Sequence, residues 1–147
     1  MTEDSALELA REIMTKCSSF VLATADAQGR PYMRWMGAIV RDPQDEWTLY
    51  MEAHASSRKI QQITSNPAAQ LLYTCEGYSH ILTLDGVADV VQDPQIRKMV
   101  YEGIPGSSRF FSGPEDPALG VIRFRTTALE VYAHAEGGGT VRVELSD

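Results

Sequence analysis

The chain has 147 residues, of which 44% are hydrophobic and 22% are charged, and this composition is typical of one globular domain, residues 1–147, around one hydrophobic core. Its 13 basic and 20 acidic side chains give a net charge of −7, which argues against a nucleic-acid-binding protein, because such proteins normally carry a basic excess or stripe. No apolar run approaches the ~20 residues of a membrane-spanning helix, and the acidic, amphipathic N-terminus is unlike a signal peptide, so we expect a cytoplasmic protein.

The two cysteines, Cys17 and Cys75, occur singly and far apart in the sequence. Cysteines in a cytoplasmic protein are kept reduced. We therefore expect two buried thiols and no disulfide bond.

The first predicted element is an amphipathic helix. Ser5 and Glu8 have the spacing of a capping box, which predicts that the helix begins at Ser5. Apolar residues then recur with a helical period and form one face: Ala6, Leu9, Ala10, Ile13, Met14 and Cys17.

After this helix the pattern alternates with a period of two, which is typical of strands. Strands are predicted at residues 19–25, 30–40, 47–53, 68–75 and 78–91, followed by three strands between 119 and 147 with a turn at "EGGG". Short helices are predicted after Ser57 and at 93–104, and Gly86 is expected to mark a bulge or a bend. We expect a mainly β fold in which sequential antiparallel strands close into a small barrel.

Several common functional motifs are absent from the sequence. It has no dinucleotide-binding fingerprint, no P-loop and no nucleophile elbow. The three histidines have no metal-ligand spacing, so we expect no metal site. No side chain is indicated as a catalytic acid, base or nucleophile, and the catalytic residues stay unassigned.

The helix that begins near Ser57 carries two cations at an unfavourable place. Arg58 and Lys59 lie in its first turn, where the helix dipole is already positive. A bound phosphate would reverse this penalty, since the Ser57 hydroxyl, both cations and the free backbone N–H groups could all contact it. The alternative interpretation is that both side chains simply extend into solvent.

Arg34 strengthens the anion hypothesis. It lies within the most apolar hairpin, in "YMRWMGAIV", and a charge in such a strand is rarely buried without a partner. If its face of the strand lines a cleft, Arg34 could reach the same anion as Arg58 and Lys59. The alternative is an arginine on a solvent-facing strand.

In their order, these segments resemble the pyridoxamine 5′-phosphate oxidase-like family of FMN-binding split barrels, and most closely its general stress protein subgroup. The resemblance is carried by "SFVLATADAQGRPYMRWM", "WTLYMEAHASSRKIQQITSNPAAQLLY", "LDGVADVVQDP" and "GPEDPALGVIRF". It implies a six-stranded antiparallel split β-barrel that forms a homodimer, with FMN bound at the subunit interface.

The resemblance also assigns cofactor-binding residues. Ser57, Arg58 and Lys59 match the family's serine-arginine-lysine that holds the FMN phosphate, and Arg34 matches a strand arginine that approaches the same phosphate. The flavin ring is expected along the backbone of Trp35, Met36 and Gly37. Glu52 and Ala53 match the end of a strand whose backbone meets the cofactor, although the family commonly has a threonine where this chain has alanine.

Two departures concern the substrate. True pyridoxamine phosphate oxidases have a lysine where this chain has Ile39, and they have an arginine-x-histidine near the C-terminus where this chain has Arg142, Val143 and Glu144. Both of those motifs serve the vitamin phosphate. The resemblance therefore implies the family's cofactor and not its substrate.

The sequence leaves several functions open. The first is an FMN-dependent oxidoreductase of unknown substrate, in which Tyr32, Trp35 and Tyr50 either shape the pocket or simply pack the barrel and interface. The second is a non-catalytic flavin-binding stress or sensor protein, and the third is a related barrel that uses the deazaflavin F420 or haem.

Overall fold

The structure is a computed structural model of the chain and describes residues 1–134 and 137–145. Its strands are β1 (Ser19–Ala25), β2 (Pro31–Met36), β3 (Val40–Arg41), β4 (Thr48–His54), β5 (Ala68–Thr74), β6 (His80–Val90), β7 (Leu119–Ala133) and β8 (Gly139–Glu144). Its helices are α1 (Glu3–Lys16), α2 (Arg58–Ser65) and α3 (Pro94–Gly103), with single 3₁₀ turns at Glu76–Tyr78 and Ser107–Arg109.

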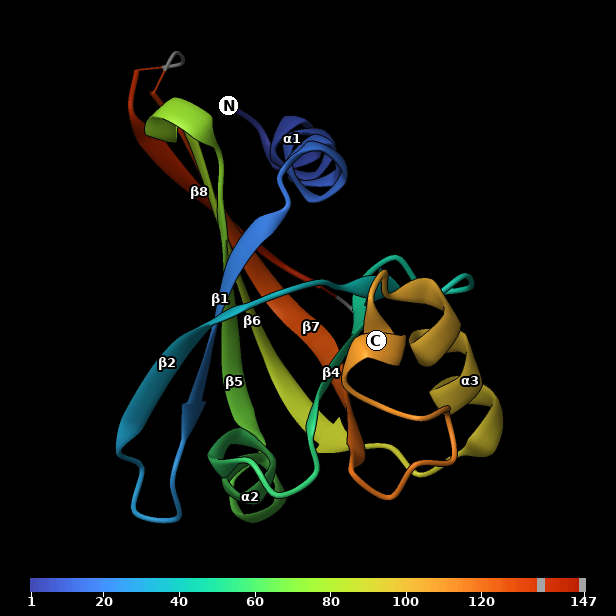
Figure 1. Ribbon diagram of the computed structural model, residues 1–147. Helices are drawn as coiled ribbons and strands as arrows, with labels where there is room; N and C mark the ends of the chain where they lie inside the picture. Colours follow the sequence, from blue (N-terminus) through green and yellow to red (C-terminus); the bar gives the residue numbers. More distant parts are fainter. Residues whose placement is uncertain (135–136, 146–147) are drawn as a thin grey trace.

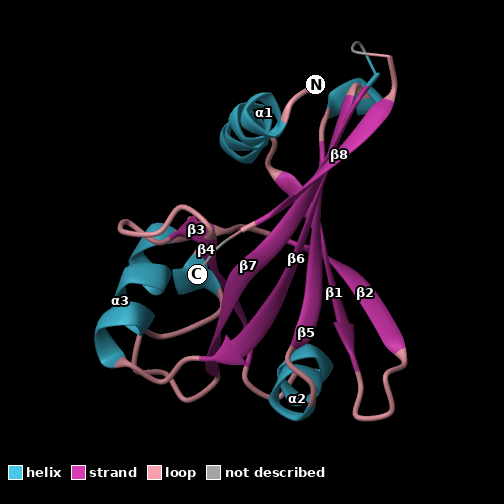
Figure 2. Ribbon diagram, turned by 180° about the vertical axis from the view of Figure 1, so that it is seen from behind, coloured by secondary structure: helices cyan, strands magenta, loops and turns pink. Residues whose placement is uncertain are grey.

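The strands form one antiparallel sheet that curls into a split barrel, as expected (Figures 1 and 2). Their order is β2-β1-β5-β6-β7-β4-β3, and β8 pairs with β7. The sheet has eight strands instead of the six that the family resemblance implies. The two additional strands are the two-residue β3, which pairs with β4, and β8, which pairs with β7. Three strands were predicted after residue 119, but the described residues form two, the 15-residue β7 and β8. The predicted turn begins at Glu136, which lies outside the described residues.

The N-cap of helix α1 is Thr2, three residues before the predicted Ser5. The Ser5 N–H donates to Thr2 Oγ1 at 3.1 Å, and the Thr2 N–H donates to Ser5 Oγ at 2.9 Å. This reciprocal pair is a capping box with serine at its third helical position. Ala6, Ala10 and Ile13 form the buried face of α1, which covers one end of the barrel (Figure 1).

The sheet buries its two faces in different ways. Inward-facing side chains of all the long strands form the main core, which includes Leu22, Met51, Leu71, Leu84 and Phe124. A smaller core forms where α3 and the loop after it cover the outer face of β4 and β7, and it contains Tyr50, Val100, Ile104, Phe111 and Val121. Successive residues of β4 therefore point into different cores, because strand side chains alternate between faces.

Gly86 occupies a bulge in β6, as predicted. The pairing of β6 with β7 shifts register between Asp85 and Gly86. A Cβ atom at Gly86 would lie 2.6 Å from Phe124 Cζ and would collide with the Arg125 carbonyl oxygen. Only glycine allows the two strands to approach this closely.

The prediction of two reduced cysteines is wrong. Cys17 and Cys75 form a disulfide bond, with their Cα atoms 5.3 Å apart. The cause is the pairing of β1 with β5, in which Ser19 lies opposite Thr74. Cys17 precedes β1 and Cys75 follows β5, so this register brings the two thiols together. Disulfides are rare in cytosolic proteins, so this bond does not support the expected cytoplasmic location.

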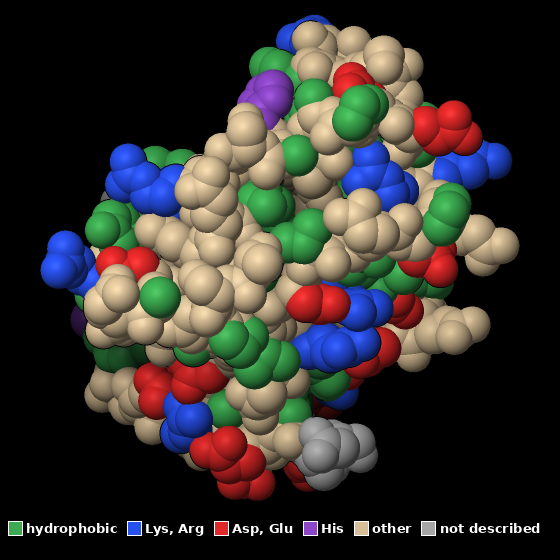
Figure 3. Space-filling model, turned by 90° about the horizontal axis from the view of Figure 1, so that it is seen from below, with side chains coloured by type: hydrophobic (Ala, Val, Ile, Leu, Met, Phe, Trp, Pro, Cys, Tyr) green, Lys and Arg blue, Asp and Glu red, His purple; other side chains and the backbone are tan. Residues whose placement is uncertain are grey.

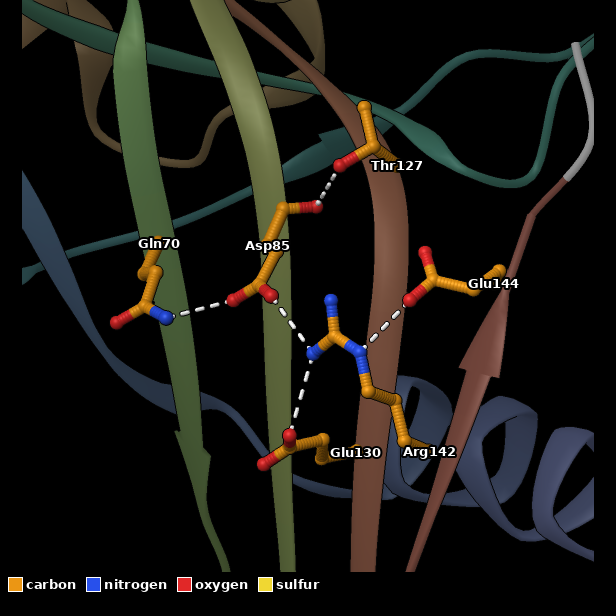
Figure 4. A network of polar contacts seen from close by, with 6 residues as sticks. All are labelled: Gln70, Asp85, Thr127, Glu130, Arg142 and Glu144. Carbon is orange, nitrogen blue, oxygen red and sulfur yellow. Dashed lines mark hydrogen bonds and ion pairs between the residues drawn. The ribbon is translucent and has the colours of Figure 1, made fainter.

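A polar network crosses the outer face of β5, β6, β7 and β8 (Figure 4). The Arg142 guanidinium at its centre donates to Glu144 Oε1 at 2.8 Å, Asp85 Oδ2 at 2.9 Å and Glu130 Oε1 at 3.2 Å. Asp85 also accepts from Gln70 Nε2 at 2.6 Å. These hydrogen bonds raise the pKa of Arg142 above its ordinary value and hold its side chain on this surface.

The surface seen from below is mixed in charge. Figure 3 shows acidic and basic side chains lying side by side across the middle of this face. It is therefore not a uniform basic surface of the kind that contacts nucleic acid. Among the described residues, no helix combines the length and the apolar character needed to cross a bilayer.

Candidate functional site

The corner between β4 and α2 positions Ser57. The chain turns after His54, and the Ser57 N–H donates to the His54 carbonyl at 2.9 Å. Ser57 has extended backbone angles and is the N-cap residue of α2, but its side chain makes no capping hydrogen bond. Within residues 1–134 and 137–145, its buried Oγ has no hydrogen-bond partner at all. A buried hydroxyl in this state costs free energy, and such a group in a native fold calls for an explanation.

Arg34 is aimed at the same corner by a buried polar pair. Its Nη1 donates to Thr24 Oγ1 at 2.8 Å and to the Leu22 carbonyl at 3.1 Å, and its Nη2 donates to Gln62 Oε1 at 3.3 Å. Thr24 and Gln62 are only 3% and 6% exposed and are joined by a 2.6 Å hydrogen bond. Arg34 therefore points from the inward face of β2 toward α2, and its guanidinium is partly buried. The alternative interpretation, an arginine that faces solvent, is wrong.

The cations at this corner repel one another. Burial lowers the pKa of Arg34 below its ordinary value, and the charge of Arg58 lowers it further. Burial likewise lowers the pKa of Lys59 below its ordinary value, and the charge of Arg34 lowers it further. In the part of the chain that the structure describes, none of the three forms an ion pair with a carboxylate.

Arg58 is more exposed than the other two cations, and its guanidinium lies 5.4 Å from the centre of the Tyr32 ring. A cation over an aromatic face is favourable. Tyr32 therefore supports the charge of Arg58. We call the group of Arg34, Ser57, Arg58 and Lys59 the anion cradle.

A hollow lies at the end of β4, and one of its lining residues is His54, whose carbonyl accepts from the Ser57 N–H. It has a volume of about 330 Å³, and we call it the aromatic pocket. Its lining residues come from the segment after β2, the end of β4 and the loop after α3: Gly37, Ala38, Glu52, Ala53, His54, Ile104, Pro105, Phe110 and Phe111. Gly37, Glu52 and Ala53 were predicted from the sequence, and the structure brings them together here.

The remaining predicted residues lie on different faces of β2. Met36 packs against the main core, whereas the Trp35 side chain points outward and is 67% exposed. The Trp35 side chain therefore lies away from the anion cradle. Tyr50 is buried in the smaller core, and its hydroxyl donates to Asp42 Oδ2 at 2.8 Å, so its role is packing.

Sequence reasoning missed the residues that support the site from distant elements. Thr24 and Gln62 lie in segments that carry the family resemblance, but nothing in those segments indicated that the two residues would contact Arg34. Ser107 Oγ donates to Glu52 Oε2 at 2.8 Å, and nothing in the sequence indicated this contact either. The adjacent pair Phe110 and Phe111 was visible as two aromatics in an irregular loop, and this was the one available hint of a pocket.

Comparison with known proteins identifies the family. A model of the pyridoxamine 5′-phosphate oxidase family matches residues 6–133, which is most of the chain. The chain belongs to the pyridoxamine 5′-phosphate oxidase family. No curated protein sequence matches it.

Solved structures of the same fold include relatives with different described cofactors. A Clostridium acetobutylicum protein related to general stress protein 26 matches with a TM-score of 0.78 at 16% identity, covering 98% of this chain and 97% of that one. A Nostoc punctiforme protein described as pyridoxamine 5′-phosphate oxidase-related and FMN-binding matches with a TM-score of 0.71 at 11% identity. The match covers 99% of this chain and 96% of that one. The haem storage protein HutZ from Vibrio cholerae matches with a TM-score of 0.63 at 18% identity, covering 82% of this chain and 89% of that one. At these identities the likeness shows the fold alone.

In this member of the pyridoxamine 5′-phosphate oxidase family, the two positions that differ from true pyridoxamine phosphate oxidases lie away from the aromatic pocket. Ile39 lines a neighbouring cavity of about 270 Å³ beneath α1. Arg142 is held by three carboxylates in the network of Figure 4. Neither residue is among those that line the aromatic pocket.

Proposed function

We propose that this chain binds FMN and serves as a flavin-dependent oxidoreductase on a substrate other than pyridoxamine 5′-phosphate. The observation that carries the proposal is the anion cradle. In the part of the chain that the structure describes, a buried hydroxyl without a hydrogen-bond partner, the N-terminus of α2 and three cations without carboxylate partners meet at one corner of the fold. A phosphate would satisfy all of them at once.

The residues of the cradle fit the phosphate of FMN. Arg34 and Lys59 supply partly buried positive charge, Ser57 Oγ supplies a donor, and the more exposed Arg58 adds further charge. Glu52 and Ala53 at the end of β4, together with Gly37, offer backbone groups for the flavin ring beside the aromatic pocket. Bound FMN would supply the hydride or electron transfer, while the protein binds, orients and shields the reacting groups.

The absorption spectrum of the purified protein tests the cofactor. Flavin, deazaflavin and haem absorb at different wavelengths, so one spectrum separates the three candidates. We expect a flavin spectrum, and titration with NADH or NADPH under air then distinguishes a turning-over oxidoreductase from a protein that only stores or senses flavin. A haem spectrum with no flavin would overturn the proposal.

The substrate departures give a further expected outcome. Ile39 cannot make the charge-assisted phosphate contact of a lysine, which is typically worth about 1.5–3 kcal/mol. Arg142 is already bound to three carboxylates. We therefore expect negligible formation of pyridoxal 5′-phosphate from pyridoxamine 5′-phosphate, measured by the absorbance of the aldehyde product, and rapid formation would contradict the proposed substrate difference.

We also propose that the chain forms a homodimer through the outer face of β2, β1 and β5. Trp35, Val21 and Leu72 lie at the same register on these three neighbouring strands. Together with the 76% exposed Met33, they present an apolar row on an edge of the sheet, beside a hollow of about 790 Å³. A second copy would cover this row and remove the exposed edge. Arg34 of the cradle lies on the other face of β2, so a flavin held between subunits, as the family resemblance implies, would need an interface that also extends round the edge of β2.

A further inference from the structure

The aromatic pocket combines one carboxylate with apolar and aromatic walls. Glu52 is the single acidic residue among those that line it, and none of them is lysine or arginine. This is the reverse of the anion cradle, which is purely basic. The cradle and the aromatic pocket therefore favour ligand groups of opposite charge.

Glu52 is fixed in the pocket by its neighbours. It lies on the same face of β4 as Tyr50 and His54, and this face is covered by α3 and the loop after it. Ser107 Oγ, from the 3₁₀ turn that follows α3, donates to Glu52 Oε2 at 2.8 Å. This contact holds one carboxylate oxygen and leaves the other oxygen available to a ligand.

Among the residues that the structure describes, no cation forms an ion pair with this carboxylate. Burial raises the pKa of Glu52 above its ordinary value, and the hydrogen bond from Ser107 offsets this only in part. Across residues 1–134 and 137–145, Glu52 takes part in no ion pair. A partly buried carboxylate without a counter-ion is the arrangement that a bound cation would stabilise.

The aromatic walls suit the body of such a ligand. The rings of His54 and Phe111 pack with their centres 5.1 Å apart, and Phe110 lies next to them with 66% of its surface exposed. A large apolar ring left open at the mouth of a pocket provides a face for a flat ligand or for a cation. The volume of about 330 Å³ is at the lower end of the range for small-molecule sites.

We propose that the aromatic pocket is the substrate subsite and that it selects a small organic cation, such as an amine or amidine with an aromatic body, whose charge pairs with Glu52 and whose ring packs on Phe110. This inference rests on the proposed function, because it places the substrate beside the proposed flavin position. It assigns a specificity-determining role to Glu52. An anionic substrate would meet an unpaired carboxylate and would be rejected.

Three probes of the same shape test the charge preference. Benzamidine is a cation, benzamide is neutral and benzoate is an anion, and all three carry the same ring. We would measure their binding to the full chain by isothermal titration calorimetry, first without flavin and then saturated with FMN. We expect benzamidine to bind about tenfold or more tighter than benzamide, and benzoate to bind weakest.

Single substitutions test whether the preference for a cationic probe comes from Glu52. Glu52→Gln keeps the size of the side chain and should remove the advantage of benzamidine over benzamide. Phe110→Ala, at an exposed position, should weaken both probes and keep their order. Glu102→Gln removes an exposed carboxylate of α3 and is the matched control, with no effect expected.

The outcomes separate this inference from the proposed function. Equal binding of the three probes, no binding at millimolar concentration, or an unchanged preference in Glu52→Gln would overturn the cation subsite. Displacement of benzamidine by FMN would also overturn it, because the pocket would then be only the seat of the flavin. A protein that binds benzamidine through Glu52 but binds no FMN would refute the proposed function and leave the cation site standing.

Discussion

At the scale of single residues, the site depends on groups that the rest of the fold leaves unsatisfied. Ser57 Oγ is buried without a partner, and Arg34 and Lys59 are desolvated next to other cations. Each of these features costs stability in the absence of a ligand. Their concentration at one corner is the physical reason to regard that corner as a binding site.

Replacing Ser57 by alanine separates binding from capping. An ordinary N-cap serine stabilises its helix by about 0.5–2 kcal/mol, but Ser57 makes no capping bond here. We expect Ser57→Ala to leave the melting temperature of the flavin-free protein unchanged or higher, and to weaken FMN about tenfold. Thermal melting and flavin fluorescence titration measure the two effects. A destabilised protein with unaltered FMN affinity would identify Ser57 as a conventional cap.

Replacing Arg58 and Lys59 by alanine tests the cations of the cradle. Charge-assisted contacts are typically worth about 1.5–3 kcal/mol each, with less from the exposed Arg58, so the double variant should bind FMN roughly a hundredfold more weakly. Without flavin it should be as stable as the parent or more so, because two cations leave the positive end of α2.

The control for this experiment is the pair Arg125→Ala and Lys98→Ala, which removes one arginine and one lysine from exposed positions of β7 and α3. Riboflavin, which lacks the phosphate, should bind the parent and the double variant of Arg58 and Lys59 similarly. Equal FMN affinity in the parent and that variant would mean that both side chains only face solvent.

At the scale of elements, the disulfide joins the end of α1 to the end of β5. It closes a loop with a sequence separation of 58 residues, on the side of the fold opposite to α2 (Figure 1). A cross-link of this length restricts the unfolded chain and so stabilises the folded one. The cradle depends on α2 and β2, so α1 can be loosened without moving it.

Breaking the disulfide should therefore lower stability and leave the cradle intact. For a loop of this length the loss is roughly 2–4 kcal/mol, and it should appear in urea unfolding after treatment with dithiothreitol. A Cys17→Ser, Cys75→Ser variant should show the same lowered stability and no response to the reductant. FMN affinity should stay unchanged in both. Identical unfolding of the parent with and without reductant would show that the two cysteines are not bonded in solution.

At the scale of the whole molecule, one exposed apolar row on the edge of the sheet stands out. Met33 and Trp35 lie on the outer face of β2, opposite to the face that carries Arg34. β2 thus presents an interaction surface on one side and a cradle residue on the other. This arrangement would couple assembly to cofactor binding if a second copy covers the outer face.

The assembly is tested by light scattering. We expect the parent to have twice the 16.3 kDa mass of the chain at micromolar concentration, and Trp35→Glu combined with Met33→Glu to have the single mass, because two charges would enter an apolar interface. Phe110→Glu, which changes an exposed aromatic on another surface, should stay dimeric. A monomeric parent with FMN bound would refute the proposed interface.

The sequence by itself determined the local features of this protein. Alternating apolar residues predicted the long strands, Asp93 and Pro94 predicted the start of α3, and Gly86 predicted the bulge. The "SSRK" segment and Arg34 indicated an anion site, because a charge out of place is visible without knowing its neighbours. The position of Ser5 in the capping box was misread by one turn, since Thr2 offers the same chemistry three residues earlier.

Only the tertiary structure decided which distant residues meet. The register of β1 against β5 joins Cys17 to Cys75, and the packing of β1 beside α2 places Thr24 and Gln62 behind Arg34. The loop after α3 brings Ser107 to Glu52 across 55 positions of the chain. Such contacts follow from strand pairing and core packing over the whole sheet, so no local pattern contains them.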